Sequence, residues 1–299
     1  MTKIAYILLS FALAFATVCT CYGQLEVSVE LSGLSCDSVR LRSFNWQKKA
    51  GTNLVMPYSE TVTFKQKSAL KPGAYWITAD STPVATVILS AKKKQKVSLM
   101  VSPAGVTFSN SPENTRYEQY LTQIKEYEQQ MAGLDQEFRD AQNLPAYMLR
   151  TLADSLTTRA RRIVAARTAY EQQVIHDNPN TLLASIVGAS IPPPEVPVEY
   201  YNNPRKMQEF FISHFFDNFP WNDPRIFNTP VAEEKFKSYV DFVYQVDRPD
   251  LDTFVVEALK ASSIDTASHR MFFERLDKDL GYYMSNYKVE HTYIKIDQL

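Results

Sequence analysis

The stretch SPENTRYEQYLTQIKEYEQQMAGLDQEFRDAQNLP, residues 111–145, decides how this chain folds. Its apolar residues recur at steps of three and four, the spacing of one helix face; they are Tyr117, Tyr120, Ile124, Tyr127, Met131, Leu134 and Phe138. Ser111 suits the N-cap position and Pro112 suits the first helical turn, where its missing N–H costs nothing. The sequence Asn143-Leu144-Pro145 ends the pattern. We therefore predict one long helix here and interpret its tyrosines as a core seam rather than a sugar-binding strip.

A second apolar helical pattern follows the break, carried by Leu149, Leu152, Leu156, Ile163, Tyr170 and Val174. Two long helices joined by a short break are expected to fold back as an antiparallel hairpin. Further helical patterns cover 181–188, 204–217, 231–246, 249–261 and 267–286, and an extended proline-rich segment at 191–197 interrupts them. Residues 111–299 are therefore predicted to form an all-α domain.

Upstream of this region the hydrophobic period is two. Leu25, Val27, Val29 and Leu31 alternate with polar residues, and shorter runs of the same kind follow at 39–42, 62–65, 75–79, 84–89 and 97–101. Alternation lets one face of a sheet bury apolar side chains while the other face stays in water. We predict a two-domain β + α protein, in which an antiparallel β-sandwich over residues 24–110 precedes the all-α domain.

The first 23 residues are typical of a secretory signal peptide. Lys3 gives a positive start, residues 4–18 are almost wholly apolar, and small residues precede Gln24. We expect cleavage after Gly23, export to the periplasm, and no membrane-spanning helix once the signal is removed. Lipoprotein processing at Cys19 or Cys21 is the alternative, although the residues just before these cysteines suit that cleavage poorly.

Composition and charge exclude several classes. The 299 residues are 45% hydrophobic, which is ample for a packed core, and 8 glycines against 16 prolines disfavour folds built on glycine-rich nucleotide loops. A net charge of −1 gives no reason to expect nucleic acid as a partner. Residues 24–110 hold 11 Lys and Arg against 5 Asp and Glu, whereas residues 111–299 hold 20 against 28. We interpret this split as complementary fields that orient the modules toward each other, or alternatively as a basic sandwich that meets an anionic partner.

A search for catalytic chemistry finds no motif for a catalytic residue, a cofactor or a metal. Once the signal is removed Cys36 is the one cysteine left, so an internal disulfide or a Cys-x-x-Cys pair is excluded. We expect Cys36 to be a small buried residue. The four histidines, His176, His214, His269 and His291, lack metal-ligand spacing. We expect His214 to be packed and hydrogen-bonded, and we single out Trp221, in a predicted loop, as the residue most suited to ligand contact.

Several short motifs resemble a known group of proteins. They are Ser-Pro-Glu-Asn at 111–114, Phe-Asp-Asn-Phe at 216–219, Asp-Pro-Arg at 223–225 and Thr-Pro at 229–230. Together with the predicted signal peptide and β module, they resemble the two N-terminal modules, of unknown function, of exported thiol:disulfide interchange proteins from Bacteroidota. Those proteins continue into a thioredoxin-like domain with a Cys-x-x-Cys pair. This sequence ends at Leu299, near where the linker to that domain would begin, so the resemblance assigns redox activity to no residue here.

Three functional hypotheses follow from these observations. We prefer a non-catalytic periplasmic accessory protein that binds a protein partner in the cell envelope. The second is a truncated or split thiol–disulfide oxidoreductase whose thioredoxin domain lies elsewhere. The third is a glycan- or small-ligand-binding module, suggested by Trp221 and by the basic sandwich.

Overall fold

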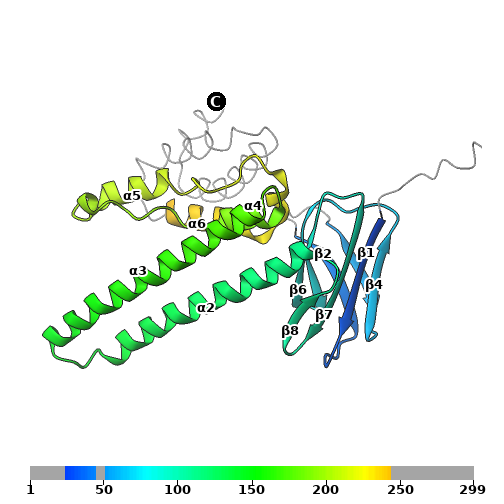
Figure 1. Cartoon of the computed structure of the whole chain (residues 1–299), viewed down its shortest axis with the longest axis horizontal. Helices are drawn as coiled ribbons and strands as arrows, with labels where there is room; N and C mark the ends of the chain where they lie inside the picture. The colour runs from blue at the N-terminus through cyan, green and yellow to red at the C-terminus, as the bar shows by residue number, and fades with distance from the viewer. Residues whose placement is uncertain (1–23, 45–50, 244–299) are drawn as a thin grey trace, which may run out of the picture.

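The protein consists of a β-sandwich followed by a helical module (Figure 1). A computed structural model describes residues 24–44 and 51–243. Among these residues, strands occur up to Phe108 and helices occur from Pro112 onward. The predicted two-part β + α architecture is therefore confirmed.

In the described residues, the sandwich consists of two sheets of four strands each. One sheet has the order β4-β1-β7-β8, with β4 Thr61–Gln66, β1 Gln24–Leu31, β7 Lys94–Ser102 and β8 Gly105–Phe108. The other has the order β3-β2-β5-β6, with β3 Asn53–Pro57, β2 Ser38–Ser43, β5 Gly73–Ala79 and β6 Thr82–Leu89. The inner faces bury the alternating residues that the period of two predicts, such as Val27, Leu41 and Ile77.

The strand pairing corrects the sequence-based expectation in one respect. Among the strands of the described residues, β1 and β7 pair in parallel and the other pairs are antiparallel. The connection after β6 leads into the opposite sheet, so β7 enters beside β1 from the same end of the sandwich. Parallel neighbours need such a crossover, which local periodicity cannot reveal.

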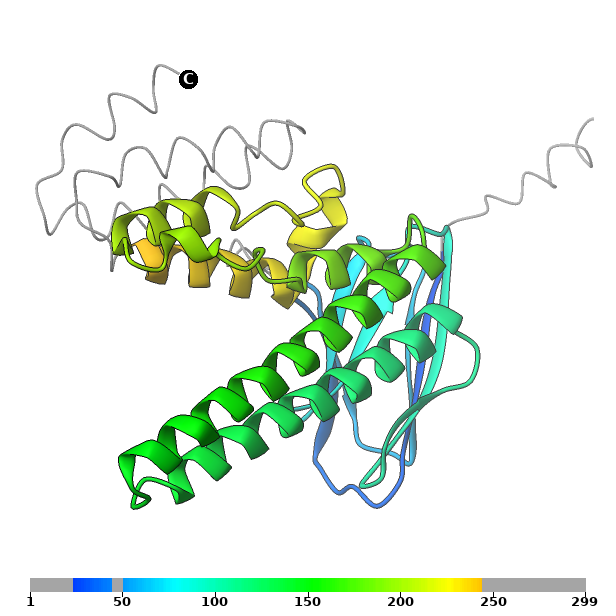
Figure 2. The same cartoon turned by 60° about the vertical axis from the view of Figure 1, so that its left-hand side comes forward.

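The helical module begins with the predicted hairpin. Its elements are α2 Pro112–Asp140, α3 Ala146–Asp177, α4 Leu182–Ser190, α5 Pro204–Ser213 and α6 Pro230–Val243, with 3₁₀ turns η1 Val198–Tyr200 and η2 Pro224–Asn228. Figure 2 shows α2 and α3 side by side, projecting away from the sandwich. The helices predicted at 249–261 and 267–286 lie outside the described residues. Within the described part of the chain, no helix has the combined length and apolarity needed to cross a bilayer.

The heptad seam of α2 is confirmed along most of its length. Tyr117, Tyr120, Ile124 and Leu134 are buried, and the Tyr120 and Tyr170 rings stack at 6.3 Å between centroids. Phe138 continues the pattern but is 39% exposed, because it lies in the last turn of α2 at the far end of the hairpin. The tyrosines near the sandwich are therefore core residues, as predicted.

The two modules meet through a carboxamide that pairs with a strand edge. Ile88 on the edge strand β6 donates its backbone N–H to Asn114 Oδ1 at 2.7 Å, and Asn114 Nδ2 donates to the Ile88 carbonyl at 2.9 Å. Asn114 Nδ2 also donates to Ser111 Oγ at 2.7 Å, so the Ser111 hydroxyl supports Asn114 and does not cap α2. Asn114 is only 1% exposed. Its amide therefore satisfies backbone groups that would otherwise be buried without a partner.

A second contact brings η2 against the turn that precedes β5. Asn228 Nδ2 donates to the Pro72 carbonyl at 3.1 Å. A Cβ atom at Gly73 would lie 2.6 Å from Asn228 Cβ and 2.8 Å from the Asn228 carbonyl oxygen, so no larger residue fits without displacing the backbone. Among residues 24–44 and 51–243 no ion pair joins the two modules. The contact between them is made by neutral amides and apolar packing, so the predicted complementary fields do not act here as direct ion pairs.

We expect Gly73→Ala to destabilise the protein by about 1–3 kcal/mol, because the added methyl group overpacks the contact with Asn228. Urea unfolding followed by circular dichroism measures this loss. Gly133→Ala is the matched control: nothing lies within 4 Å of a Cβ at Gly133 on α2, so the same change should stabilise the helix by roughly 0.5–1 kcal/mol. Equal stability of the Gly73→Ala variant and the wild type would contradict the close approach.

Candidate functional site

Two adjoining pockets lie where the C-terminal end of α3 meets α4 and the segment 216–230. The first, the polar pocket, has a volume of about 420 Å³ and includes Thr181, Ser185 and Asn222 in its lining. The second, the apolar pocket, has a volume of about 610 Å³ and includes Val164 and residues 192–194. Ile175, Ile191 and Asn218 line both, so we treat the pair as one continuous site, the α3–α4 groove. Each volume lies in the range of known ligand sites.

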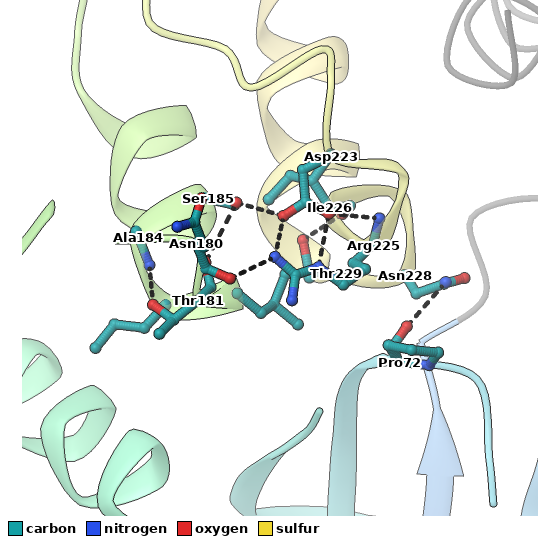
Figure 3. A network of polar contacts seen from close by, with 12 residues as sticks. Pro72, Asn180, Thr181, Ala184, Ser185, Asp223, Arg225, Ile226, Asn228 and Thr229 are labelled. Atoms are coloured by element: carbon teal, nitrogen blue, oxygen red, sulfur yellow. Dashed lines mark hydrogen bonds and ion pairs between the residues drawn. The ribbon is translucent and has the colours of Figure 1, made fainter. Parts of the chain in front are cut away.

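An ion pair builds one wall of the polar pocket (Figure 3). Asp223 Oδ1 accepts a hydrogen bond from Arg225 Nε at 2.7 Å, and Asp223 Oδ2 accepts one from Arg225 Nη2 at 2.8 Å. The Ser185 hydroxyl on α4 donates to Asp223 Oδ2 at 2.5 Å, and Arg225 Nη2 also donates to the Asn180 carbonyl at 3.2 Å. These bonds fix η2 to the first turns of α4, so the pocket wall is rigid before any ligand arrives.

The charges of this wall neutralise each other. Burial by itself raises the pKa of Asp223, but the hydrogen bonds from Arg225 and Ser185 and the positive charge of Arg225 outweigh it, so the pKa ends below its usual value. The hydrogen bond to Asp223 in turn raises the pKa of Arg225. Both groups therefore stay charged and paired at neutral pH, and the wall offers a ligand a dipolar surface rather than a net charge.

Both ends of α4 are held by other elements. At its start, Thr181 Oγ1 accepts from the Ala184 N–H at 3.1 Å, while Glu113 Oε1 accepts from the Leu182 and Leu183 N–H groups at 2.8 and 3.2 Å. These contacts occupy the donors at the helix N-terminus, which would otherwise attract an anion.

The other end of α4 is tied to α6. Lys235 Nζ donates to the Ile191 carbonyl at 3.0 Å and lies 4.8 Å from the centre of the Phe215 ring. Burial lowers the pKa of Lys235 to about 8. Ile191 lines both pockets, so this lysine helps to position the middle of the groove.

The apolar pocket has a proline wall. Residues 192–194 are three consecutive prolines, which hold the backbone extended without helical hydrogen bonds. An exposed ion pair between Arg161 Nε and Glu195 Oε1, 3.6 Å apart, links this segment to α3. Val164 on α3 also lines the pocket and is 47% exposed. The pocket thus presents an apolar surface whose shape is fixed because the proline rings restrict the backbone.

Asn218 and Asn222 supply carboxamides to the groove. Asn218 lines both pockets and Asn222 lines the polar one. Within the described part of the chain, neither side chain makes a hydrogen bond, although each amide can donate two and accept two. Both are therefore available to a ligand that carries its own N–H and C=O groups.

The structure places Trp221 in the core rather than at a ligand surface. Its side chain is 4% exposed and packs among Phe216, Phe219 and Phe236, with ring centroids 4.6 to 5.9 Å apart. A ligand could reach this indole only if the aromatic cluster opened. The groove is built without it, and the predicted ligand contact at Trp221 has no support in this geometry.

The two histidines within the described residues each contact a carboxylate close by in the sequence. His214 Nδ1 lies 2.6 Å from Asp217 Oδ2 and its ring packs 4.3 Å from that of Phe210, as the sequence predicts. His176 Nδ1 lies 3.0 Å from Asp177 Oδ1. No group of three or more His, Cys, Asp or Glu residues among those described could hold a metal ion. His269 and His291 lie outside the described residues.

Cys36 is half-buried against the sandwich core. Burial raises the pKa of its thiol, and the carboxylates of Asp80 and Asp37 raise it further. Thiol–disulfide exchange requires the thiolate, so this environment disfavours that chemistry.

The sequence did not predict this groove. Asp223-Pro224-Arg225 stood out only as a motif of the family resemblance. Asp223 also accepts a hydrogen bond from Ser185, 38 residues away, and no local sequence pattern predicts that contact.

Comparison with known proteins adds one finding. Residues 163–299 match a family described as a domain of unknown function, DUF5106. The match begins inside α3 and includes the described part of the groove from Val164 onward. No curated protein and no solved structure matches the chain. The comparisons therefore show an uncharacterised domain and no relation to thioredoxin-like proteins.

We expect Asp223→Asn to lower the stability at pH 7 by about 1–2 kcal/mol, because Arg225 loses a charged partner. A depressed folded-state pKa contributes stability above the ordinary Asp range, and that contribution is lost as the pH falls through the folded value. The wild type should therefore lose more stability than Asp223→Asn between about pH 5 and pH 2.

Urea unfolding at several pH values, followed by tryptophan fluorescence, measures both effects. Asp154→Asn, on the exposed side of α3, is the matched control and should follow the wild type at each pH. Parallel stability profiles for the wild type and Asp223→Asn would show that the pair contributes nothing specific.

Proposed function

We propose that this protein is a non-catalytic accessory protein of the bacterial cell envelope that binds an extended segment of a protein partner in the α3–α4 groove. The observation that carries this proposal is the combination of two unbonded carboxamides with an apolar proline wall in one continuous site. Amides recognise a peptide backbone, and apolar walls receive its side chains.

The fold itself contains an example of the recognition that we propose. Asn114 pairs with both the N–H and the C=O of Ile88, at 2.7 and 2.9 Å, on β6, which is an edge strand among the described strands. Asn218 and Asn222 carry the same functional group into the groove. An extended peptide passing over them would find the donor and acceptor that β6 finds in Asn114.

The lining also favours a peptide over a sugar or an anion. None of the described lining residues is Trp, Tyr or Phe, the side chains on which sugar rings commonly stack. The Asp223–Arg225 pair is already neutralised and the N-terminus of α4 is occupied by Glu113, so an anionic ligand gains little here. Because the walls are held in place by these bonds, the groove itself loses little conformational entropy when a ligand binds.

Two features of the sequence support the cellular setting. The first 23 residues are typical of a secretory signal, which supports export to the periplasm. The environment of Cys36 disfavours its thiolate, which supports a role for these residues that does not use Cys36 in thiol–disulfide exchange.

The test uses residues 24–299 and a fluorescein-labelled, permanently unfolded polypeptide, with binding followed by fluorescence anisotropy. We expect saturable binding that Asn218→Leu weakens about tenfold, the loss of one or two hydrogen bonds to a peptide. Val164→Glu should weaken it by a similar factor, because a charge replaces part of the apolar wall.

Val198→Glu is the matched control for Val164→Glu. Val198 is 72% exposed and lies in η1 outside both pocket linings, so the same substitution there should leave binding unchanged. Absence of binding, or equal weakening by both valine substitutions, would exclude the groove as the peptide site.

A further inference from the structure

Lysines gather at the end of the sandwich where β1 begins. In the strand register Gln24 lies opposite Lys94 of β7, and Leu25 lies opposite Gln66, the last residue of β4, so Lys67 continues β4 at the same end. In Figure 1, β1 starts at the upper end of the sandwich. The lysines at this end, which we call the lysine end, are Lys65, Lys67, Lys71, Lys92, Lys93, Lys94 and Lys96, and all are exposed.

The acidic residues of the sandwich are segregated to the opposite end. Glu30, Asp37, Glu60 and Asp80 lie around the end of β1, the start of β2 and the β5–β6 turn, where Leu31 N–H donates to the Glu60 carbonyl and Asp80 accepts from the Asp37 N–H. Glu26 is the exception, and Lys96 Nζ pairs with its Oε1 at 3.2 Å. Within the described residues the other six lysines of this end have no acidic partner. Their charges are therefore available to a partner.

A buried amide holds the lysine-bearing loops together. Gln95 is only 3% exposed, and its Oε1 accepts from the Leu70 N–H at 2.8 Å. Its Nε2 donates to the carbonyls of Leu70 and Ser90, at 3.0 and 2.8 Å. This single side chain joins the loop that contains Lys71 to the loop that contains Lys92 and Lys93. The lysine end is thus a preorganised cationic surface rather than a set of independent tails.

We propose that the lysine end binds the anionic headgroups of a phospholipid bilayer and positions the sandwich on a membrane surface. The covalent connection argues for a membrane over other polyanions. The apolar run of residues 4–18 ends six residues before Gln24, a distance of at most about 22 Å in an extended chain. While that run is in a membrane, the lysines lie within reach of its surface.

Cleavage of the signal peptide would add a positive charge to the lysine end and would remove none of its lysines. A cut after Gly23 would leave the new α-amino group at Gln24, opposite Lys94 and beside Lys67. Each lysine near an anionic bilayer contributes to binding in roughly additive fashion, and the attraction falls with ionic strength. A cluster of this size therefore gives reversible, salt-dependent adsorption.

The test is co-sedimentation of residues 24–299 with vesicles. We expect binding to vesicles of phosphatidylcholine with about 30% phosphatidylglycerol and none to phosphatidylcholine alone. Replacing Lys92, Lys93 and Lys94 together by Gln should lower the partition coefficient about 100-fold, because each lysine contributes a factor of about five. These lysines are exposed, so thermal unfolding of the variant should match the wild type.

The control variant removes three positive charges from the α2–α3 hairpin instead of from the lysine end. Lys125→Gln, Arg150→Gln and Arg162→Gln together change three exposed residues of α2 and α3 and should leave vesicle binding intact. Val164→Glu should also retain it, which separates this proposal from the peptide groove.

Three outcomes would overturn the proposal. One is equal loss of vesicle binding in both triple variants. The second is complete competition by inorganic phosphate at the same phosphate concentration as the lipid, which would indicate a site for single phosphates. The third is binding to an acidic polysaccharide without binding to anionic vesicles.

Discussion

The close approach of η2 to the turn before β5 is the constraint on which the rest of this structure depends. Gly73 leaves room for the backbone of Asn228, and the Asn228 amide bonds to Pro72. The same short segment carries Asp223 and Arg225, which hold α4. One stretch of chain therefore joins the sandwich to the helices and builds a wall of the groove.

The two modules were predictable because the spacing of apolar residues over short stretches of sequence indicates strands in one module and helices in the other. Alternation over residues 24–31 and the three-and-four spacing of 117–138 each favour one kind of element, and both modules follow from them. The parallel pairing of β1 with β7, and the exposed strand β3, depend instead on which sheet each connection enters. Periodicity carries no information on that choice.

The candidate site was less predictable for a related reason. Trp221 drew attention as a tryptophan beside a turn, yet the surrounding phenylalanines bury it. The groove depends on neutral groups, Ser185 and Asn218, whose residue types are common and carry no motif. They become recognisable only when the fold places them beside a charged pair and a run of prolines.

Segregated charge also gives the sandwich an electric dipole along its strands. Lysines at one end and carboxylates at the other are separated by the length of an eight-residue strand, about 26 Å. Near a negative surface such a body experiences a torque that turns the positive end inward before contact. The sandwich would stand upright on that surface and keep its acidic loops farthest from it.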